Sequence, residues 1–206
     1  MKVRTALIIL LALVSAPIAA MAQTTPAPVT ASAADAAYVV TGYYNVNFGG
    51  GLFKDRSTGT SGGGGGSLIF WGREAFSTEV DVNYNPKFFG TTGDLGSNSL
   101  MTFTVNGLFG PWMGPNKNIR PYALLGGGML RGSIASFADN NMSTSTTMGV
   151  FDIGGGVFYF FTPKFGSRFD IRYRVGLGAS TDPATGWGLL EDWNYMRATF
   201  GLTYAF

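Results

Sequence analysis

An alternation of period two along the last segment constrains this chain more than any other feature. Apolar or aromatic side chains occupy every second position, at Met196, Ala198, Phe200, Leu202, Tyr204 and Phe206. The interleaved positions are small or polar apart from one ring, at Tyr195, Arg197, Thr199, Gly201, Thr203 and Ala205. Successive side chains of a β-strand point to opposite faces, so this pattern predicts a strand with one apolar and one polar face.

The preceding segment repeats this alternation and adds charge. Apolar residues at Phe169, Ile171, Tyr173, Val175 and Leu177 alternate with Arg168, Asp170, Arg172, Arg174 and Gly176. Charges of both signs on one strand face suit an enclosed, salt-bridged lumen as well as a solvated surface. A soluble lipocalin-like barrel, with the apolar face inside and the arginines in water, therefore stays open as an alternative from this strand alone.

The number of strands and their connections favour a membrane barrel. The pattern predicts eight strands, at 38–48, 67–73, 77–85, 99–109, 121–132, 148–161, 167–178 and 194–206. Long polar connections (49–66, 88–98, 135–147 and 179–193) alternate with mostly shorter ones (74–76, 110–120 and 162–166). Long and short loops in alternation, with an even number of strands, are typical of outer-membrane barrels. We predict an all-β fold, an eight-stranded antiparallel transmembrane β-barrel with both termini in the periplasm.

Aromatic residues support the same fold by their position. One group lies beside the short turns or the chain ends: Tyr38, Phe109, Trp112, Tyr122, Tyr159, Phe161, Phe165, Phe169, Tyr204 and Phe206. A second group lies near the long loops: Tyr44, Phe48, Phe89, Trp187 and Trp193. Two such groups predict aromatic belts at the two bilayer interfaces.

The first segment predicts export. Lys2 and Arg4 precede an apolar run, and Ala20 and Ala22 place small residues before a cut ahead of Gln23, so residues 1–22 are predicted to be a signal peptide. Residues 23–36 are predicted to be a flexible leader, and 37–206 the barrel domain. Lys2 and Arg4 account for two of the 14 basic residues, which leaves 12 basic against 12 acidic. This balance argues against nucleic-acid binding.

The signal peptide, the eight alternating strands and the terminal ring resemble the OmpA/OmpX-type outer-membrane β-barrel family of Gram-negative bacteria. The resemblance implies that the barrel-assembly machinery recognises a C-terminal signal formed by Phe200, Leu202, Tyr204 and Phe206. It also implies a surrounding of outer-membrane lipid and lipopolysaccharide. The family's peptidoglycan-binding domain has no counterpart here, so we expect no cell-wall tether. Enzymes built on small outer-membrane barrels depend on an active-site His, and this chain has none.

Charged residues at predicted inward positions form the candidate site. They are Glu79, Asp81, Arg131, Asp152, Arg168, Asp170, Arg172, Arg174 and Arg197. An eight-stranded barrel is just wide enough to be filled by side chains, and buried charges need partners, so a salt-bridged plug is the favoured interpretation. A gated, charge-selective pore is the second. With no His or Cys, we expect no catalysis, no cofactor and no metal site.

Glycine runs and the last long loop complete the candidates. The five glycines at 62–66 predict a mobile loop, whereas the runs at 126–128 and 154–156 fall within strands. Trp187 and Trp193 belong either to a recognition surface on loop 179–193 or to the outer aromatic belt.

We therefore expect a non-enzymatic integral outer-membrane protein, a scaffold for surface loops with a role in envelope integrity or surface interaction. A narrow porin-like channel for ions or small solutes is the alternative. A closed barrel leaves no strand edge that demands a partner, so we expect a monomer whose long loops contact any surface ligand.

Overall fold

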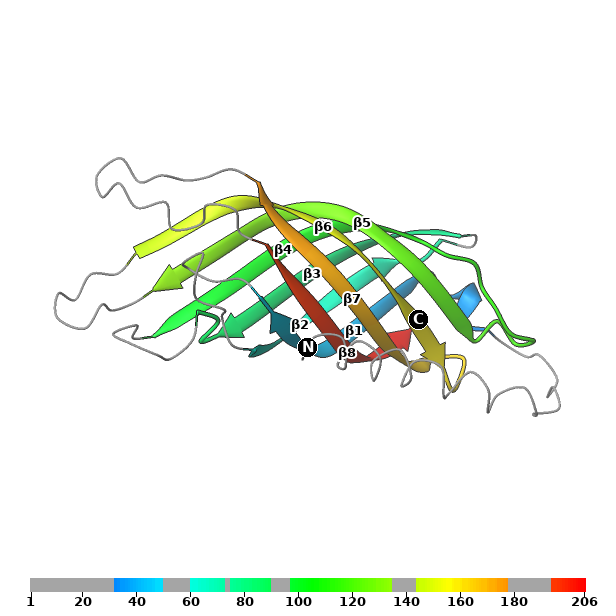
Figure 1. The fold of residues 1–206 in the computed structure, drawn as a ribbon. Helices are drawn as coiled ribbons and strands as arrows, with labels where there is room; N and C mark the ends of the chain where they lie inside the picture. Colours follow the sequence, from blue (N-terminus) through cyan, green and yellow to red (C-terminus); the bar gives the residue numbers. More distant parts are fainter. Residues whose placement is uncertain (1–31, 50–59, 73–74, 90–96, 135–143, 178–193) are drawn as a thin grey trace, which may run out of the picture. The chain divides into compact units, whose positions relative to one another are not determined.

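The computed structural model describes residues 32–49, 60–72, 75–89, 97–134, 144–177 and 194–206. Eight antiparallel strands close into one barrel in chain order, as Figure 1 shows. The strands are β1 (Tyr38–Phe48), β2 (Ser61–Phe70), β3 (Phe76–Pro86), β4 (Asn98–Phe109), β5 (Ile119–Ile134), β6 (Thr144–Phe160), β7 (Phe165–Leu177) and β8 (Asn194–Ala205). The predicted fold class is confirmed.

The barrel closes where the first strand pairs with the last. Val39 lies opposite Ala205 and Phe48 opposite Met196, and the Phe206 amide donates to the Tyr38 carbonyl at 3.0 Å. We call the end that holds Tyr38, Phe206 and the connections 71–75, 110–118 and 161–164 the turn end. The opposite end, with connections 49–60, 87–97, 135–143 and 178–193, is called the loop end.

The glycine run is part of β2, so the predicted mobile loop at 62–66 is wrong. Gly65 pairs with Tyr43 on one side and with Asn83 on the other. On the lumen face of β2, side chains from the neighbouring strands take the space that a side chain of β2 would fill. A Cβ atom added to Gly65 would lie 2.6 Å from the Tyr43 hydroxyl oxygen. The glycines therefore allow close packing across this strand.

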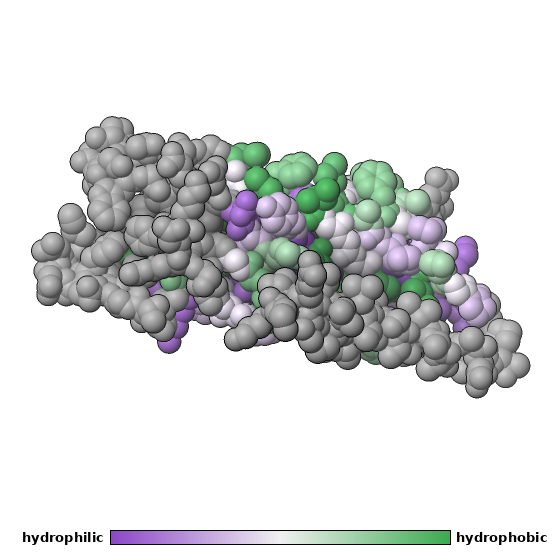
Figure 2. Space-filling model, in the orientation of Figure 1, coloured by the Kyte–Doolittle hydropathy of each residue, from purple (hydrophilic) through white to green (hydrophobic). Residues whose placement is uncertain are grey.

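The two faces of the barrel wall are opposite in polarity. On β8, Phe200 and Leu202 are 60% and 66% exposed, whereas Arg197 is fully buried. Apolar residues line the upper edge of the barrel wall in the view of Figure 2. Charges inside and apolar side chains outside are the arrangement of a membrane barrel, and the lipocalin-like alternative is excluded because it requires the reverse.

The last part of the predicted flexible leader is folded. Residues Ala33–Asp35 form a short 3₁₀ turn, and Ser32 caps it through its side chain while Asp35 accepts from the Ser32 amide. Ala33 is buried against the turn end of the barrel. The folded unit therefore begins before residue 37. The predicted signal peptide and cleavage site lie outside the described residues, within which no helix is long and apolar enough to span a membrane.

Three predicted belt aromatics do not lie on the outer face. Tyr122 and Phe89 are 6% and 7% exposed and belong to buried clusters, and Trp112 packs against the buried cluster at the turn end. Tyr38, Phe109, Phe161 and Phe165 do lie outside, each at least 43% exposed. Position near a turn predicted the level of a ring along the barrel but not the face on which it lies. Trp187 and Trp193 are outside the described residues.

Candidate functional site: the charged lumen

Eight of the nine predicted lumen charges are buried inside the barrel. Each is at most 1% exposed: Glu79, Asp81, Asp152, Arg168, Asp170, Arg172, Arg174 and Arg197. Four carboxylates thus meet four guanidinium groups, which makes this group of side chains neutral. We call these eight side chains the charge network.

Arg131 is the exception, and its predicted inward position is wrong. The even-numbered residues of β5 face inward, as buried Arg120, Tyr122 and Leu130 show, so Arg131 is exposed on the outer face. Its Nη2 lies 3.4 Å from Ser145 Oγ of the adjacent strand. Apolar residues occur on both faces of β5, and the glycines between them carry no polarity, so the sequence does not show which positions face inward.

The two acids of β3 bind arginines on the far side of the barrel. Glu79 pairs with Arg168, and its Oε2 lies 3.0 Å from Arg172 Nη2. Asp81 Oδ1 lies 3.2 Å from both Arg174 Nη2 and Arg197 Nη1. Since β3 is four strands from β7 and three strands from β8 in a ring of eight, these ion pairs span the lumen.

The other two acids pair with the same arginines along the second half of the wall. Asp170 lies 2.8 Å from Arg168 Nε and 2.9 Å from Arg172 Nε. Asp152 Oδ1 lies 2.9 Å from Arg174 Nε. Buried charges are tolerable only when they are paired, and each of these acids is paired with at least one arginine.

Two tyrosines support the charge network, and the sequence analysis missed their role. The Tyr43 hydroxyl reaches across β2 and donates to Asp81 Oδ2 at 2.6 Å. The Tyr122 hydroxyl reaches across β6 to Asp170 Oδ2 at 3.1 Å. The strands that carry the two accepting acids share a sequence pattern, in which an Asp between two apolar residues is followed by a polar residue and a Tyr. It reads Val80-Asp81-Val82-Asn83-Tyr84 on β3 and Phe169-Asp170-Ile171-Arg172-Tyr173 on β7.

Four buried asparagines form a further polar layer that the sequence analysis missed. Asn45 and Asn47 on β1 donate to Asn85 Oδ1 on β3, at 2.7 and 2.9 Å. Asn83 in turn donates to Asn45 Oδ1 at 2.6 Å. In the sequence, the two asparagines of each strand are two residues apart, which places them on one face of that strand. On β3 this is the face that also carries Glu79 and Asp81.

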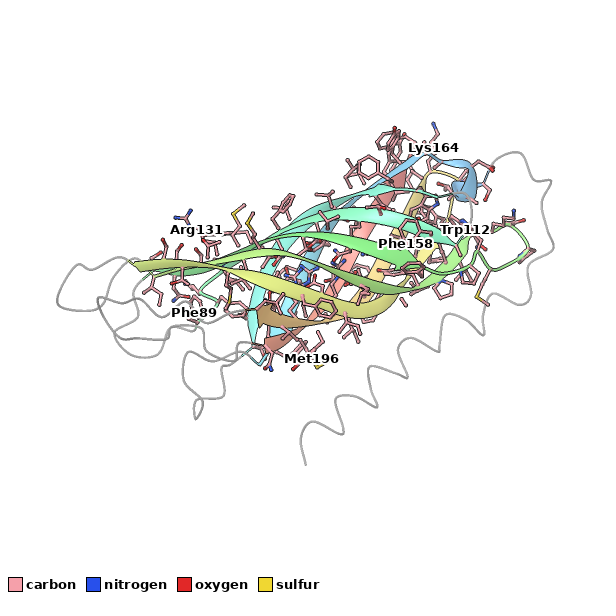
Figure 3. All side chains as sticks on the ribbon, turned by 90° about the horizontal axis from the view of Figure 1, so that it is seen from above. Phe89, Trp112, Arg131, Phe158, Lys164 and Met196 are labelled. Carbon is pink, nitrogen blue, oxygen red and sulfur yellow. The ribbon has the colours of Figure 1, made fainter. Side chains whose placement is uncertain are left out.

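Apolar clusters lie in the lumen toward both ends of the barrel. The turn-end cluster comprises Ala33, Val39, Ile69, Trp71, Leu108, Tyr122, Leu124, Phe158, Phe160 and Ala205. The loop-end cluster comprises Phe88, Phe89, Leu100, Leu130, Ile134, Met148, Val150 and Tyr195. Figure 3 shows Phe89 and Trp112 toward opposite ends of the barrel. The charge network thus lies between two apolar layers.

Arg120 is a buried lumen arginine that the sequence analysis did not single out. Its guanidinium carbon lies 4.5 Å from the centre of the Trp71 ring, where a cation–π contact stabilises the charge. Its Nη1 donates to Ser77 Oγ at 2.8 Å and its Nε to the Gly110 carbonyl at 3.0 Å. Arg120 therefore belongs to the turn end and not to the charge network.

The chemistry of this site is that of a filled interior. The chain has no His and no Cys, and in the described ranges no three Asp or Glu side chains are grouped as a metal site would require. The four carboxylates of the charge network pair with arginines, and two of them, Asp81 and Asp170, also accept from tyrosine hydroxyls.

Comparison with solved structures finds the same fold in small bacterial outer-membrane proteins. Neisserial surface protein A has a TM-score of 0.62 at 13% identity, covering 82% of this chain and 96% of that one. Ail of Yersinia pestis has a TM-score of 0.53 at 16% identity, covering 82% and 97%. A major outer membrane protein of Thermus thermophilus has a TM-score of 0.52 at 12% identity, covering 82% and 99%.

No curated protein sequence matches the chain. A family model does match, over residues 7–206, and its description is outer membrane protein beta-barrel domain. That span contains every strand of the barrel with its charged interior and apolar exterior. The chain belongs to the outer membrane protein β-barrel family.

Proposed function

We propose that this protein is a non-enzymatic integral outer-membrane scaffold whose closed barrel anchors the long connections of the loop end. One observation carries the proposal: the charge network is buried and neutral, and apolar clusters lie on both sides of it. Side chains that pair with one another across the lumen fill the space that a solute would need, so we assign contacts with other molecules to the connections of the loop end.

The alternative, a narrow channel for ions or small solutes, requires these pairs to separate. Arg172 contacts Glu79 and Asp170 at once, and Arg174 contacts Asp81 and Asp152. Parting one arginine from two acids leaves uncompensated charges in a poorly solvated interior, at a cost of about 3–5 kcal/mol. A permeating ion would also have to pass the apolar layers.

Single-channel conductance in a planar lipid bilayer tests the proposal. We expect the refolded wild-type barrel to give no discrete current steps. The double variant Arg172→Ala, Arg174→Ala removes two arginines that each pair with acids on both sides of the lumen, and it is expected to give steps or a leak. Regular steps from the wild-type protein would refute the closed scaffold and establish the channel.

Arg131→Ala is the matched control for this experiment. It makes the same side-chain change on the outer face, where Arg131 is exposed and outside the charge network. We expect it to be as silent as the wild type. Current from this variant would trace the leak to general damage of the barrel and not to the lumen.

The long connections are proposed to carry contacts at the cell surface. Ail, one of the proteins with this fold, has been solved in complex with the heparin analogue sucrose octasulfate, with a TM-score of 0.51 to this chain. Because the longer connections of this chain lie at the loop end, we propose that any surface ligand binds there. A monomer in outer-membrane lipid and lipopolysaccharide suffices, because the ring of strands closes on itself.

Export and assembly complete the proposal. We propose cleavage between Ala22 and Gln23, which N-terminal sequencing of the membrane-extracted protein would detect as a chain starting at Gln23. We also propose that Phe200, Leu202, Tyr204 and Phe206 form the assembly signal, supported by their exposure along the outer face of the closing strand. Loss of Phe206 should then lower the amount of folded barrel in the outer membrane.

A further inference from the structure

The chain enters the lumen immediately after β3, at the loop end. Lys87 has a φ of 54°, in the left-handed region that non-glycine residues rarely adopt. The two residues that follow, Phe88 and Phe89, are 2% and 7% exposed. Two aromatic rings are thus buried at a position where a polar surface loop is expected to start.

Asn98, at the start of β4, holds the backbone of this segment to the wall. The Lys87 amide donates to the Asn98 carbonyl at 2.7 Å, and the Phe89 amide donates to Asn98 Oδ1 at 3.0 Å. Unfavourable backbone conformations persist where the surroundings compensate for them. Here Asn98 and the burial of the two rings contribute that compensation.

The rings contact strands on other sides of the mouth. Phe88 meets Tyr195 of β8 edge to face, with ring centres 5.2 Å apart. Phe89 lies over Gly132 of β5, where an added Cβ atom would approach Phe89 Cζ to 3.1 Å. Tyr195 also accepts from Arg174 Nη1 at 3.1 Å, so it joins this segment to the charge network.

The opposite end is closed in a different way. There, the buried rings of Trp71, Tyr122, Phe158 and Phe160 pack on one another, and three of them belong to strands of the barrel itself. Trp71 follows β2 directly, and its amide donates to the Ala37 carbonyl at 2.9 Å. Opening the turn end would require rearrangement of the wall, whereas Phe88 and Phe89 lie outside β3 and β4.

We propose that Phe88 and Phe89 form a lid that closes the lumen at the loop end, is anchored by Asn98 and opens when the two rings leave the mouth by rotation about the Lys87 backbone. The inference rests on the proposed function, because a lid has meaning only over a closed interior. Lifting it exposes the loop-end cluster to the outside while the charge network stays paired. The loop end is therefore the side from which the interior becomes accessible.

The absence of Cys from the chain permits a direct test by thiol labelling. Met148 belongs to the loop-end cluster and pairs with Leu130 on β5. Leu130 lies deeper in the barrel than Gly132, the residue over which Phe89 packs, so Met148 lies beneath the lid. We would introduce Met148→Cys, fold the protein into liposomes, and add a charged, membrane-impermeant thiol reagent outside. Ser145→Cys, at an exposed position on the same strand, reports full access.

We expect Ser145→Cys to react rapidly in every background. Met148→Cys should react slowly beneath the native lid and at least ten-fold faster with Phe88→Ala, Phe89→Ala. Asn98→Ala, which keeps both rings and removes one anchor, should raise the rate several-fold. Folding of each variant is checked by its heat-dependent shift in gel mobility.

Equal labelling of Met148→Cys with and without the two rings would overturn the lid, as would a thiol that stays unreactive in both. No acceleration by Asn98→Ala would overturn the role of Asn98 as the anchor of the lid. Conductance of the wild-type protein separates this proposal from the previous one. Current steps there refute the closed scaffold, whereas a silent wild type with equal labelling refutes only the lid.

Discussion

The first half of the barrel, β1 to β4, and the second half, β5 to β8, contain the same arrangement of three residues in different surroundings. In the first half, Tyr43 reaches across Gly65 to Asp81; in the second, Tyr122 reaches across Gly156 to Asp170. In both, an added Cβ atom on the glycine would lie 2.6 Å from the tyrosine hydroxyl oxygen. A tyrosine, a glycine and an acid on three successive strands thus occur twice, four strands apart.

The surroundings of the two tyrosines differ. Asp81, the acceptor for Tyr43, lies on the strand that also carries Asn83 and Asn85 of the buried asparagine layer. Tyr122 packs on Phe158, with ring centres 5.0 Å apart, inside the turn-end cluster. The lumen arginines of the charge network all come from β7 and β8, so the first half contributes only acids to it. The halves are therefore complementary and not interchangeable.

Removing the acid from either arrangement is expected to lower the stability of the barrel more than any other change to it. Asp81→Ala leaves Arg174 and Arg197 without a shared partner, whereas Asp170→Ala removes one of the two acids that Arg168 and Arg172 share and leaves Glu79 as the other. We expect each to lower the free energy of unfolding by about 3–5 kcal/mol, measured by guanidinium titration of the refolded barrel in detergent. A loss below about 1 kcal/mol at either site would show that the arginines find other partners.

Filling the glycines gives the next largest effect. A Cβ atom at Gly65 would overlap the Val82 carbonyl oxygen, and one at Gly156 would overlap that of Phe169. We expect Gly65→Ala and Gly156→Ala each to destabilise the barrel by about 3 kcal/mol, at the upper end for overpacking. Gly42→Ala is the control, because nothing lies within 4 Å of its Cβ position. A neutral Gly65→Ala would mean that both the tyrosine and the neighbouring strand at Val82 can move aside.

Removing the tyrosine hydroxyls gives the smallest effect. Tyr43→Phe and Tyr122→Phe each take one donor from a buried carboxylate, with an expected loss of about 2 kcal/mol. The bond of Tyr43 is shorter, 2.6 Å against 3.1 Å, so we expect its loss to be the larger. Tyr44→Phe, exposed on the outer face, should leave the same unfolding curve unchanged. A larger loss of stability for Tyr122→Phe than for Tyr43→Phe would reverse the expected ranking of the two tyrosine–acid hydrogen bonds.

Much of the fold followed from the alternation of side chains. β1 begins and ends where predicted, and the inward position of Arg168, Asp170, Arg172 and Arg174 follows from the spacing of two. The pattern failed where glycine interrupts it. The glycines at 62–66 show no alternation of apolar and polar side chains, so the sequence does not mark them as a strand. The glycines at 126–128 interrupt the alternation along β5, so the sequence does not show that the odd-numbered Arg131 faces outward.

The sequence by itself determined that this chain forms a barrel with charges on one face, because the period of a strand is a local property of the backbone. Only the tertiary structure decided which charges meet. Glu79 and Arg172 lie on opposite walls, 93 residues apart, and their pairing depends on the register of every strand between them. The structure alone also placed Phe88 and Phe89 inside the mouth, because the left-handed turn at Lys87 is set by contacts with Asn98 and the far wall.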